Sequence, residues 1–420
     1  PVYITIMILS TLIDYTHGIL VERYREDDRK ARWFVGQSGV FNLLLLGFFK
    51  YWDFLAAQLD ALLGLSLPVL GIPLPIGISF FTFQTMSYTI DVYRRDASVQ
   101  RDLISFGAFV TMFPQLIAGP IVQYRSVAKE LAHREHSAIG FALGARRFTV
   151  GLCKKVLLAN AIGTLWEECL AAQGSGDLTT LGAWMGLFAY GFQIYFDFSG
   201  YSDMAIGLGH MFGFRFPENF DYPYCAASVT EFWRRWHMSL TSWFREYLYI
   251  PLGGNRGGTA KTLRNILIVW ACTGLWHGAS WNFILWGLYF AAWLILEKYV
   301  LRGVLARTPG WIKHTYTLLV VFVGWGLFAM EDLSVCGQYL AVCFGQGALW
   351  DAGDFFWLRS YALTFLALII GATALMRRSW QRLPERAEQV LTPILMLAGS
   401  VICTAYLVDG SYNPFLYFRF

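Results

Sequence analysis

Charge is scarce in this sequence of 420 residues. Only 15% of the residues are Asp, Glu, Lys or Arg, whereas a soluble domain usually carries about 25%. Hydrophobic residues make up 56% of the chain, and its mean hydropathy is +0.44. Because no globular core needs this much apolar side chain, we expect lipid to surround most of the protein. The pattern also lacks repeats and low-complexity linkers, so we predict one membrane domain over residues 1–420.

Paired cysteines are lacking as well. The seven cysteines are scattered, and no CxxC pair or Cys/His ligand spacing occurs, so no metal site is expected. The net charge of +4 comes from short basic clusters between apolar runs, which is typical of membrane orientation and not of nucleic-acid binding. The chain starts inside an apolar run without a cleavable signal pattern, and we expect that an N-terminal segment precedes it.

Long apolar runs are abundant. A membrane-spanning helix needs about 20 apolar residues, and several runs are long enough to hold two passes or a re-entrant helix. The sequence therefore predicts an all-α polytopic membrane protein with about 10–12 transmembrane or re-entrant helices. The runs lie at 1–20, 33–52, 66–92, 103–122, 138–162, 179–212, 265–297, 314–330, 357–376 and 389–408.

The loops between these runs differ in charge. Basic loops of membrane proteins remain in the cytoplasm, so the two kinds of loop predict an orientation. We place the loops 23–32, 94–101, 125–155, 234–264, 298–313 and 377–386, which are basic, inside. We place the loops 53–65, 166–178 and 331–356, which are acidic or neutral, outside.

The run 265–297 has basic loops on both sides and should therefore leave and return to the same face. One continuous helix over it would be about 50 Å long at 1.5 Å per residue. Two half-length arms fit better, with a break at Gly274–Ser280 that contains His277. Non-helical backbone at membrane depth requires a surrounding of protein or a water-filled cavity. Pro114, Gly119 and Pro120 predict a similar break in 103–122.

We single out three of the ionisable side chains that lie within apolar runs. His277 is a candidate for proton transfer, because intramembrane ionisable groups are functional by default and imidazole titrates near neutral pH. The alternative is a histidine bonded to a backbone carbonyl in a packed bundle. Asp197 and Asp203 do not share a helical face unless Gly200 breaks the helix. They are expected to pair with Arg or line a tunnel, and a structural role is the simpler interpretation.

The stretch 217–258 alternates aromatic residues with arginines and is too charged to span lipid. It predicts an interfacial helix along the cytoplasmic face. Guanidinium groups also bind phosphate in a bidentate manner, so these arginines either hold an anionic ligand or anchor the helix to lipid headgroups. The loop Gly253–Gly258 lacks the Lys-Ser/Thr of a P-loop, which argues against a nucleotide hydrolase.

Together these stretches resemble the membrane-bound O-acyltransferase family, and most closely its bacterial alginate O-acetylation branch. The next most similar branch is the membrane protein of teichoic-acid D-alanylation. The resemblance covers almost the whole chain. It rests on specific and correctly ordered motifs at Trp233–His237, Trp243–Asn255, Gly274–Gly278, Tyr195–Asp203 and Phe113–Pro120.

The resemblance implies a central funnel ringed by helices, with the catalytic core at about 190–300. His277 would be the catalytic residue and His237 the second functional histidine. The donor would be a cytoplasmic acyl thioester such as acetyl-CoA, with no bound cofactor. We expect its phosphates on Arg234, Arg235, Arg245 and Arg256, and a tunnel lined by Trp276, Asn282, Asp197, Ser199 and Asp203.

The C-terminal ending 413–420 resembles the aromatic tail of the small partner protein in teichoic-acid D-alanylation. In that system a tail tyrosine is implicated as a transient acyl carrier. The resemblance therefore implies that Tyr417 is a possible transient acyl acceptor. The alternative is that Tyr417 is an interfacial aromatic anchor.

The expected function is O-acetylation of an extracytoplasmic polysaccharide such as alginate. The protein would be a multi-pass protein of the bacterial inner membrane, with a periplasmic acetyltransferase or acyl-relay protein as partner. A transporter or flippase for a lipid-linked glycan or anionic solute would also use broken helices and buried carboxylates. The motifs around His237 and His277 favour the enzyme, and a scaffold would leave the buried histidine unexplained.

Overall fold

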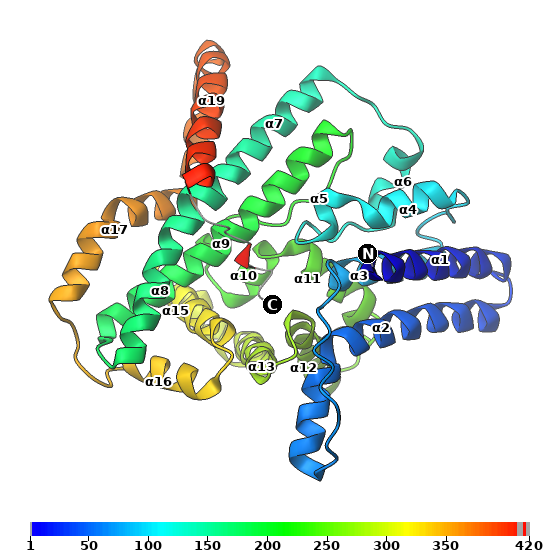
Figure 1. The fold of residues 1–420 in the computed structure, drawn as a ribbon, viewed down its shortest axis with the longest axis horizontal. Helices are drawn as coiled ribbons and strands as arrows, with labels where there is room; N and C mark the ends of the chain where they lie inside the picture. The colour runs from blue at the N-terminus through cyan, green and yellow to red at the C-terminus, as the bar shows by residue number, and fades with distance from the viewer. Residues whose placement is uncertain (1, 410–414, 417–420) are drawn as a thin grey trace. The chain divides into compact units, whose positions relative to one another are not determined.

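A computed structural model describes residues 2–409 and 415–416 (Figure 1). Within these residues the chain is helical and has no strand. The helices are α1 (Val2–Arg23), α2 (Asp28–Leu63), α3 (Ile78–Arg94), α4 (Leu103–Thr111), α5 (Phe113–Leu116), α6 (Tyr124–Ala132), α7 (Ala138–Cys153), α8 (Asn160–Ser175), α9 (Thr180–Met211), α10 (Val229–Arg235), α11 (Met238–Phe244), α12 (Thr259–His277), α13 (Trp281–Leu296), α14 (Arg302–Arg307), α15 (Gly310–Ala329), α16 (Leu333–Cys343), α17 (Ala352–Gly371), α18 (Leu375–Gln381) and α19 (Glu385–Asp409). Tighter or wider turns are η1 (Lys154–Ala159), η2 (Pro223–Cys225), η3 (Arg245–Tyr249) and η4 (Glu297–Leu301).

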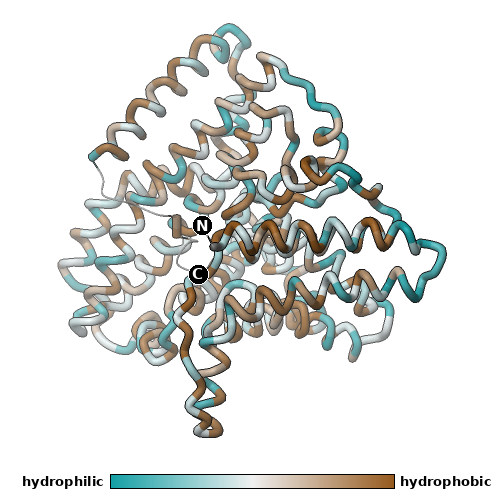
Figure 2. The backbone as a smooth tube through the Cα atoms, turned by 45° about the vertical axis from the view of Figure 1, so that its right-hand side comes forward, coloured by the Kyte–Doolittle hydropathy of each residue, from teal (hydrophilic) through white to brown (hydrophobic). Residues whose placement is uncertain are grey.

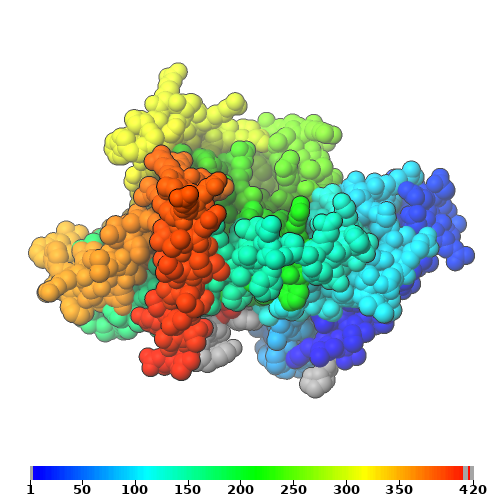
Figure 3. Space-filling view, turned by 90° about the horizontal axis from the view of Figure 1, so that it is seen from above, coloured from blue at the N-terminus to red at the C-terminus, as the bar shows by residue number. Residues whose placement is uncertain are grey.

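Seven helical stretches of the described residues are long and apolar enough to cross a membrane. Figure 2 shows apolar residues along α1 and hydrophilic ones in its connection to α2, and Figure 3 shows α19 exposed at the surface. Helices α9 and α12 also have spanning length, with 32 and 19 residues, but carry the polar side chains described below. The seven stretches are Tyr3–Arg23, Asp28–Leu63, Ala138–Ser175, Trp281–Arg307, Gly310–Ala329, Ala352–Gly371 and Glu385–Asp409. The predicted all-α polytopic fold class is confirmed.

The chain divides into two compact units. Unit 1 comprises residues 1–145 and 205–217, and unit 2 comprises 146–204 and 218–420. The predicted catalytic core falls mainly in unit 2. The single domain over 1–420 stays a prediction.

Unit 1 contains α1, α2 and α3 packed on one another, with α4 and α6 against α3. Its core includes the edge-to-face and tilted contacts of Tyr88 with Phe106 and Tyr124. Asp14 of α1 is fully buried and accepts hydrogen bonds from Ser38 (2.5 Å) and Asn42 (2.8 Å) of α2. Neutral donors therefore satisfy the carboxylate of Asp14.

Several predicted loops are helical instead. The run 53–65 is the end of α2, which stops at Gly64 in the left-handed conformation that suits a helix C-cap. Most of 166–178 belongs to α8, and α16 lies within 331–356. Charged residues marked these segments as loops, yet charged residues are good helix formers near the end of a span. The opposite error occurs before α3, where a proline-containing segment delays the helix until Ile78.

The predicted break in 265–297 is confirmed, because α12 ends at His277 and α13 begins at Trp281. The two helices pack closely: a Cβ atom on Gly274 would lie 2.3 Å from the Phe283 carbonyl oxygen. The arms are not half-length. The 19 residues of α12 correspond to about 28 Å, and the second arm continues to Arg307. The interruption predicted in 103–122 is also present, between α4 and α5.

Candidate active site

The stretch 217–258 is not the single interfacial helix that its charge predicted. It forms the short helices α10 and α11 followed by η3. Trp233, Trp236 and Trp243 are buried, because these large rings pack into unit 2 instead of facing lipid headgroups. The chain turns between α10 and α11 at His237, whose φ of 45° and ψ of 54° are uncommon outside glycine. Strained backbone of this kind persists only where the surroundings hold it.

Asn219 holds the turn at His237. Its backbone carbonyl accepts the N–H of Met238 at 2.9 Å. Its side-chain oxygen accepts the N–H and hydroxyl of Ser239 at 3.2 and 2.9 Å, and lies 3.1 Å from His237 Nδ1. The backbone N–H of Ser239 can only donate, which fixes which end of the Asn219 side chain is the oxygen. The amide NH₂ of Asn219 then donates to Ser202 of α9 at 3.0 Å. Nδ1 of His237 therefore carries the proton, and Nε2 has an unshared electron pair.

The His237 imidazole is electrically neutral near pH 7. The ring is 2% exposed, and its burial lowers the pKa of His237 to about 3. Among the described residues Nε2 has no hydrogen-bond partner. His237 is therefore equipped to accept a hydrogen bond and not to donate one through Nε2.

His277 is the last residue of α12 and is 8% exposed. Aromatic rings surround it: Trp286 of α13 and Phe328 of α15 contact it edge to face at 5.0 and 5.2 Å between ring centroids. Trp276 lies 5.1 Å from the His277 ring and 6.0 Å from that of His237. The two imidazoles thus share one aromatic neighbour, and the collar of rings limits the access of water.

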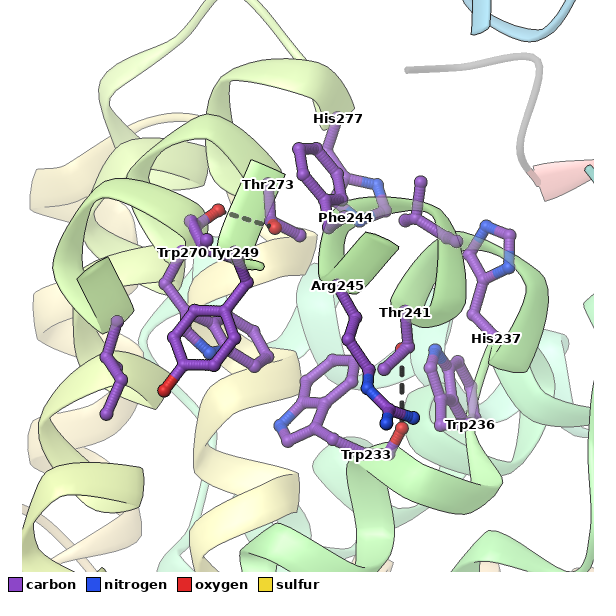
Figure 4. Close-up of a pocket in the computed structure, with 13 residues that line it drawn as sticks. Trp233, Trp236, His237, Thr241, Phe244, Arg245, Tyr249, Trp270, Thr273 and His277 are labelled. Atoms are coloured by element: carbon purple, nitrogen blue, oxygen red, sulfur yellow. Dashed lines mark hydrogen bonds between the residues drawn. The ribbon is translucent and has the colours of Figure 1, made fainter. Parts of the chain in front are cut away.

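Both histidines line a cavity of about 200 Å³, here called the histidine cavity. In the view of Figure 4 the two imidazoles lie above the guanidinium group of Arg245. Most of the remaining wall is apolar or aromatic, with Thr241 and Thr273 as polar exceptions whose hydroxyls donate to backbone carbonyls. The cavity is therefore mainly apolar, with one exposed cation and two imidazoles in its wall.

A smaller cavity of about 20 Å³, here called the inner cavity, also has His277 in its wall. Trp236 lines both cavities as well. The inner cavity is lined further by Asp197 of α9 and by Leu416 near the C-terminus. His277 and Trp236 thus stand where the two cavities adjoin, and His277 is approached from both.

The Asp197 carboxylate is paired with Lys155 of η1 at 2.5 Å and accepts the backbone N–H of Leu416 at 2.8 Å. The Lys155 ammonium group lies over the Phe415 ring, 4.9 Å from its centroid, and Phe415 contacts Tyr201 edge to face at 4.6 Å between ring centroids. The described part of the C-terminal ending is therefore attached to α9 and η1 beside the inner cavity. Tyr417 lies outside the described residues.

Asp203 has a structural role. It accepts hydrogen bonds from Arg147 at 2.7 Å and Lys154 at 2.6 Å, so the predicted pairing with Arg is confirmed. Helix α9 continues through Gly200. The helices pack closely at this point, because a Cβ atom on Gly151 would lie 2.5 Å from the carbonyl oxygen of Gly200. The ion pairs therefore join α7 and η1 to α9.

Four of the five predicted tunnel residues line neither the histidine cavity nor the inner cavity: Asp203, Ser199, Asn282 and Trp276. Ser199 is buried in α9, and its hydroxyl has no partner among the described residues. Asn282 is buried in α13 and donates to the carbonyls of Leu327 and Phe328 at 3.3 Å, which joins α13 to α15. Trp276 stands beside both histidines, and Asp197 lines the inner cavity.

The four arginines expected to bind the donor do not form one surface. Arg245 lines the histidine cavity. Arg235 forms an ion pair with Glu231 at 2.7 Å and lines a different cavity. Arg234 and Arg256 are exposed and line neither of these cavities. Donor binding by Arg245 is thus compatible with the geometry, and the role of the other three stays a prediction.

The sequence analysis selected Trp276 of the aromatic collar, but not Asn219, Trp286 or Phe328. Asn219 stands within the polar stretch 217–220, but its spacing of 18 residues from His237 gives no local signal of the contact. Trp286 and Phe328 belong to ordinary apolar helices and have no feature that distinguishes them from lipid-facing rings. Only the packing of α13 and α15 around the end of α12 reveals them.

The profile of the membrane-bound O-acyltransferase family matches residues 92–338, which is more than half of the chain. This region includes both histidines, Asn219 and the collar. The chain therefore belongs to the membrane-bound O-acyltransferase family, and it is a multi-pass membrane acyltransferase. The predicted family and enzyme class are confirmed, and the transporter alternative is set aside.

Several curated relatives are similar over most of the chain. A probable alginate O-acetylase of Azotobacter vinelandii is 44% identical over 348 residues, which cover 82% of this chain and 69% of the relative. A probable alginate O-acetylase of Pseudomonas putida is 40% identical over 436 residues, covering 98% and 89%. A peptidoglycan O-acetyltransferase of Helicobacter pylori is 36% identical over 361 residues, covering 79% and 68%.

Proposed function

We propose that this acyltransferase takes an acetyl group from cytoplasmic acetyl-CoA for the O-acetylation of an extracytoplasmic polysaccharide such as alginate. It would do so in the bacterial inner membrane with a periplasmic acetyltransferase or acyl-relay protein. The observation that carries the proposal is the place of His277, which lines both the histidine cavity and the inner cavity. The names of the alginate O-acetylase relatives support the polysaccharide.

In the proposed reaction the thioester enters the histidine cavity, where Arg245 attracts the anionic donor. An acceptor hydroxyl reaches His277 from the inner cavity. His277 takes the proton of this hydroxyl as its oxygen attacks the thioester carbonyl carbon. The C–S bond then breaks, the acyl–oxygen bond remains, and the imidazolium returns the proton to the departing CoA thiolate. The aromatic collar keeps water away from the thioester.

His237 would support this step without carrying charge. Its proton on Nδ1 is engaged with Asn219, so Nε2 accepts a hydrogen bond from the donor or from the acceptor hydroxyl. A neutral acceptor beside His277 orients the reactants and does not compete for the proton, because its pKa lies far below that of a free imidazole. We assign His237 a positioning role in the same cavity.

Tyr417 would be the first acyl acceptor. Leu416, the residue before it in the chain, lines the inner cavity with His277, and its backbone N–H donates to Asp197, which supports this proposal. The resulting acetyl-tyrosine ester would pass its acyl group to the partner enzyme. Intact-mass analysis of the C-terminal peptide during turnover should show a labile adduct of one acetyl group, absent in Tyr417→Phe. If Tyr417→Phe stays fully active, the carrier role is wrong.

The experiment that tests His277 is release of free CoA from acetyl-CoA by the purified full chain with an acceptor present. We expect His277→Ala to lower the rate by about 10²–10⁴-fold, the usual contribution of a general base. The matched control is His136→Ala, which replaces an exposed histidine of unit 1 and should leave the rate unchanged. Comparable rates for the two variants would remove His277 from the mechanism.

A further inference from the structure

A third cavity in unit 2 is larger and more polar than the other two. Its volume is about 620 Å³, and it shares no lining residue with the histidine cavity or the inner cavity. One side consists of residues 221–235, including Asp221 and Arg235. The other side is the connection 373–381 between α17 and α19, which includes Arg377 and Arg378. We call it the arginine cavity.

The arginine cavity lies at the level of lipid headgroups. Helices α17 and α19 are both candidate membrane spans, and only 11% and 6% of their most apolar windows are buried by protein. The connection between two successive spans has to lie at the membrane surface. Helix α18, within this connection, exposes Leu375 and Met376 at 55% and 63%. Figure 3 shows the long exposed side of α19, along which acyl chains can lie.

The charge of the arginine cavity is positive. Arg235 is shared between Glu231 at 2.7 Å and Asp221 at 3.9 Å. Arg377 and Arg378 have no carboxylate within salt-bridge distance among the described residues, although both line the cavity. Guanidinium groups in such a cluster match the oxygens of a phosphate group. The guanidinium groups of Arg377 and Arg378 are therefore available to bind an anion at the membrane surface.

We propose that the arginine cavity binds the phosphate group of an anionic phospholipid. Arg377 and Arg378 hold the phosphate, and the lipid chains lie against Leu375 and Met376 of α18. The phosphates of CoA have the same chemistry. A lipid is the better occupant because the cavity has an apolar exposed rim and does not share a wall with the histidine cavity. The proposal does not depend on the acyl acceptor.

The test compares the double variant Arg377→Gln/Arg378→Gln with Arg382→Gln/Arg386→Gln. Both change the net charge by the same amount, but Arg382, before α19, and Arg386, in its first turn, do not line the arginine cavity. All four side chains are exposed, so their replacement removes no buried contact. The full chain in detergent is titrated with phosphatidylglycerol or phosphatidylcholine, and retained lipid is counted by native mass spectrometry.

We expect phosphatidylglycerol to be retained on the wild type and on the control variant, and about tenfold more weakly on Arg377→Gln/Arg378→Gln. Phosphatidylcholine, whose choline cation offsets the charge of its phosphate, should be retained more weakly than phosphatidylglycerol and with a smaller difference between the variants. Equal loss in both double variants would mean general surface attraction and would overturn the site. A parallel titration with CoA distinguishes the source of the phosphate. If the cavity variant loses CoA and keeps phosphatidylglycerol, the lipid assignment is wrong.

Discussion

Units 1 and 2 both bury carboxylates in long apolar helices, but they satisfy them differently. In unit 1, Asp14 accepts hydrogen bonds from the neutral side chains of Ser38 and Asn42. In unit 2, Asp197 is paired with Lys155, and Asp203 with two cations. Neutral donors tie α1 to α2. The pair at Asp197 in addition holds the backbone of residue 416 beside a cavity.

The comparison separates two uses of buried polarity. A buried group that is fully satisfied by its neighbours specifies how helices pack, whereas a polar group in a cavity wall is available to a ligand. Asp14 belongs to the first kind, and His237, with its unpartnered Nε2, to the second. Mutations in unit 1 should therefore change stability, and mutations around the histidine cavity should change activity.

The largest effect is expected at His277. His277→Gln keeps a polar side chain of similar size but cannot relay the proton, so CoA release should fall by about 10²–10⁴-fold. Because the glutamine side chain has a similar volume among the collar rings, the melting temperature should change little. Parallel activity and melting measurements on the same preparation check both statements. A variant that melts much earlier would show that His277 is a packing residue and would erase the contrast with unit 1.

The second largest effect is expected at Lys155. Lys155→Met leaves Asp197 buried without its cation, which should cost about 3–5 kcal/mol of unfolding free energy. The double variant Lys155→Met/Asp197→Asn removes both charges and keeps an acceptor for the N–H of Leu416, so it should recover most of the loss. Denaturation of the three proteins in the same detergent measures this cycle. If the double variant is no more stable than Lys155→Met, the interaction between Lys155 and Asp197 does not stabilise the fold.

Asp14 provides the corresponding experiment in unit 1. Asp14→Ala removes the acceptor of Ser38 and Asn42 and should cost about 1–3 kcal/mol of unfolding free energy. The rate of CoA release per folded molecule should stay within the error of the wild type. A large fall in rate with unchanged melting would give Asp14 a role in the reaction and contradict the division between the units.

The sequence predicts much of the fold and the chemistry of one residue, but not the contacts that make the site. Long apolar runs locate the spans, and Gly274 with His277 marks the break between α12 and α13, because both features are local. The pairing of Lys155 with Asp197, and of Asp197 with Leu416, joins segments far apart in the chain. No periodicity or spacing encodes such pairs. They follow from the packing of α9 against η1.

The charged ends of helices were mispredicted for a related reason. Asp60 near the end of α2 suggested a loop, whereas it accepts the N–H of Ser66 and helps to end the helix at Gly64. The stretch around His237 was mispredicted because its arginines point to the surface while its tryptophans fill the core. The composition of the stretch does not distinguish its exposed arginines from its buried tryptophans. The turn at His237, which Asn219 holds, is what directs them to different sides.

The smallest effect is expected from acid at His237, a buried imidazole whose proton position follows from its hydrogen bond to Asn219. The folded state has a pKa of about 3 for His237, and an unfolded histidine about 6.5. Between these values the unfolded chain binds the extra proton, so stability falls as pH decreases through this window. At pH 5.5 the loss from this residue should be about 1 kcal/mol relative to pH 7.5. His237→Gln has no titrating group at this position. Between pH 7.5 and pH 5.5 its unfolding free energy should therefore fall less than that of the wild type, by about 1 kcal/mol. If both proteins lose the same amount, folding does not lower the pKa of His237, and burial does not hold this imidazole in the neutral form.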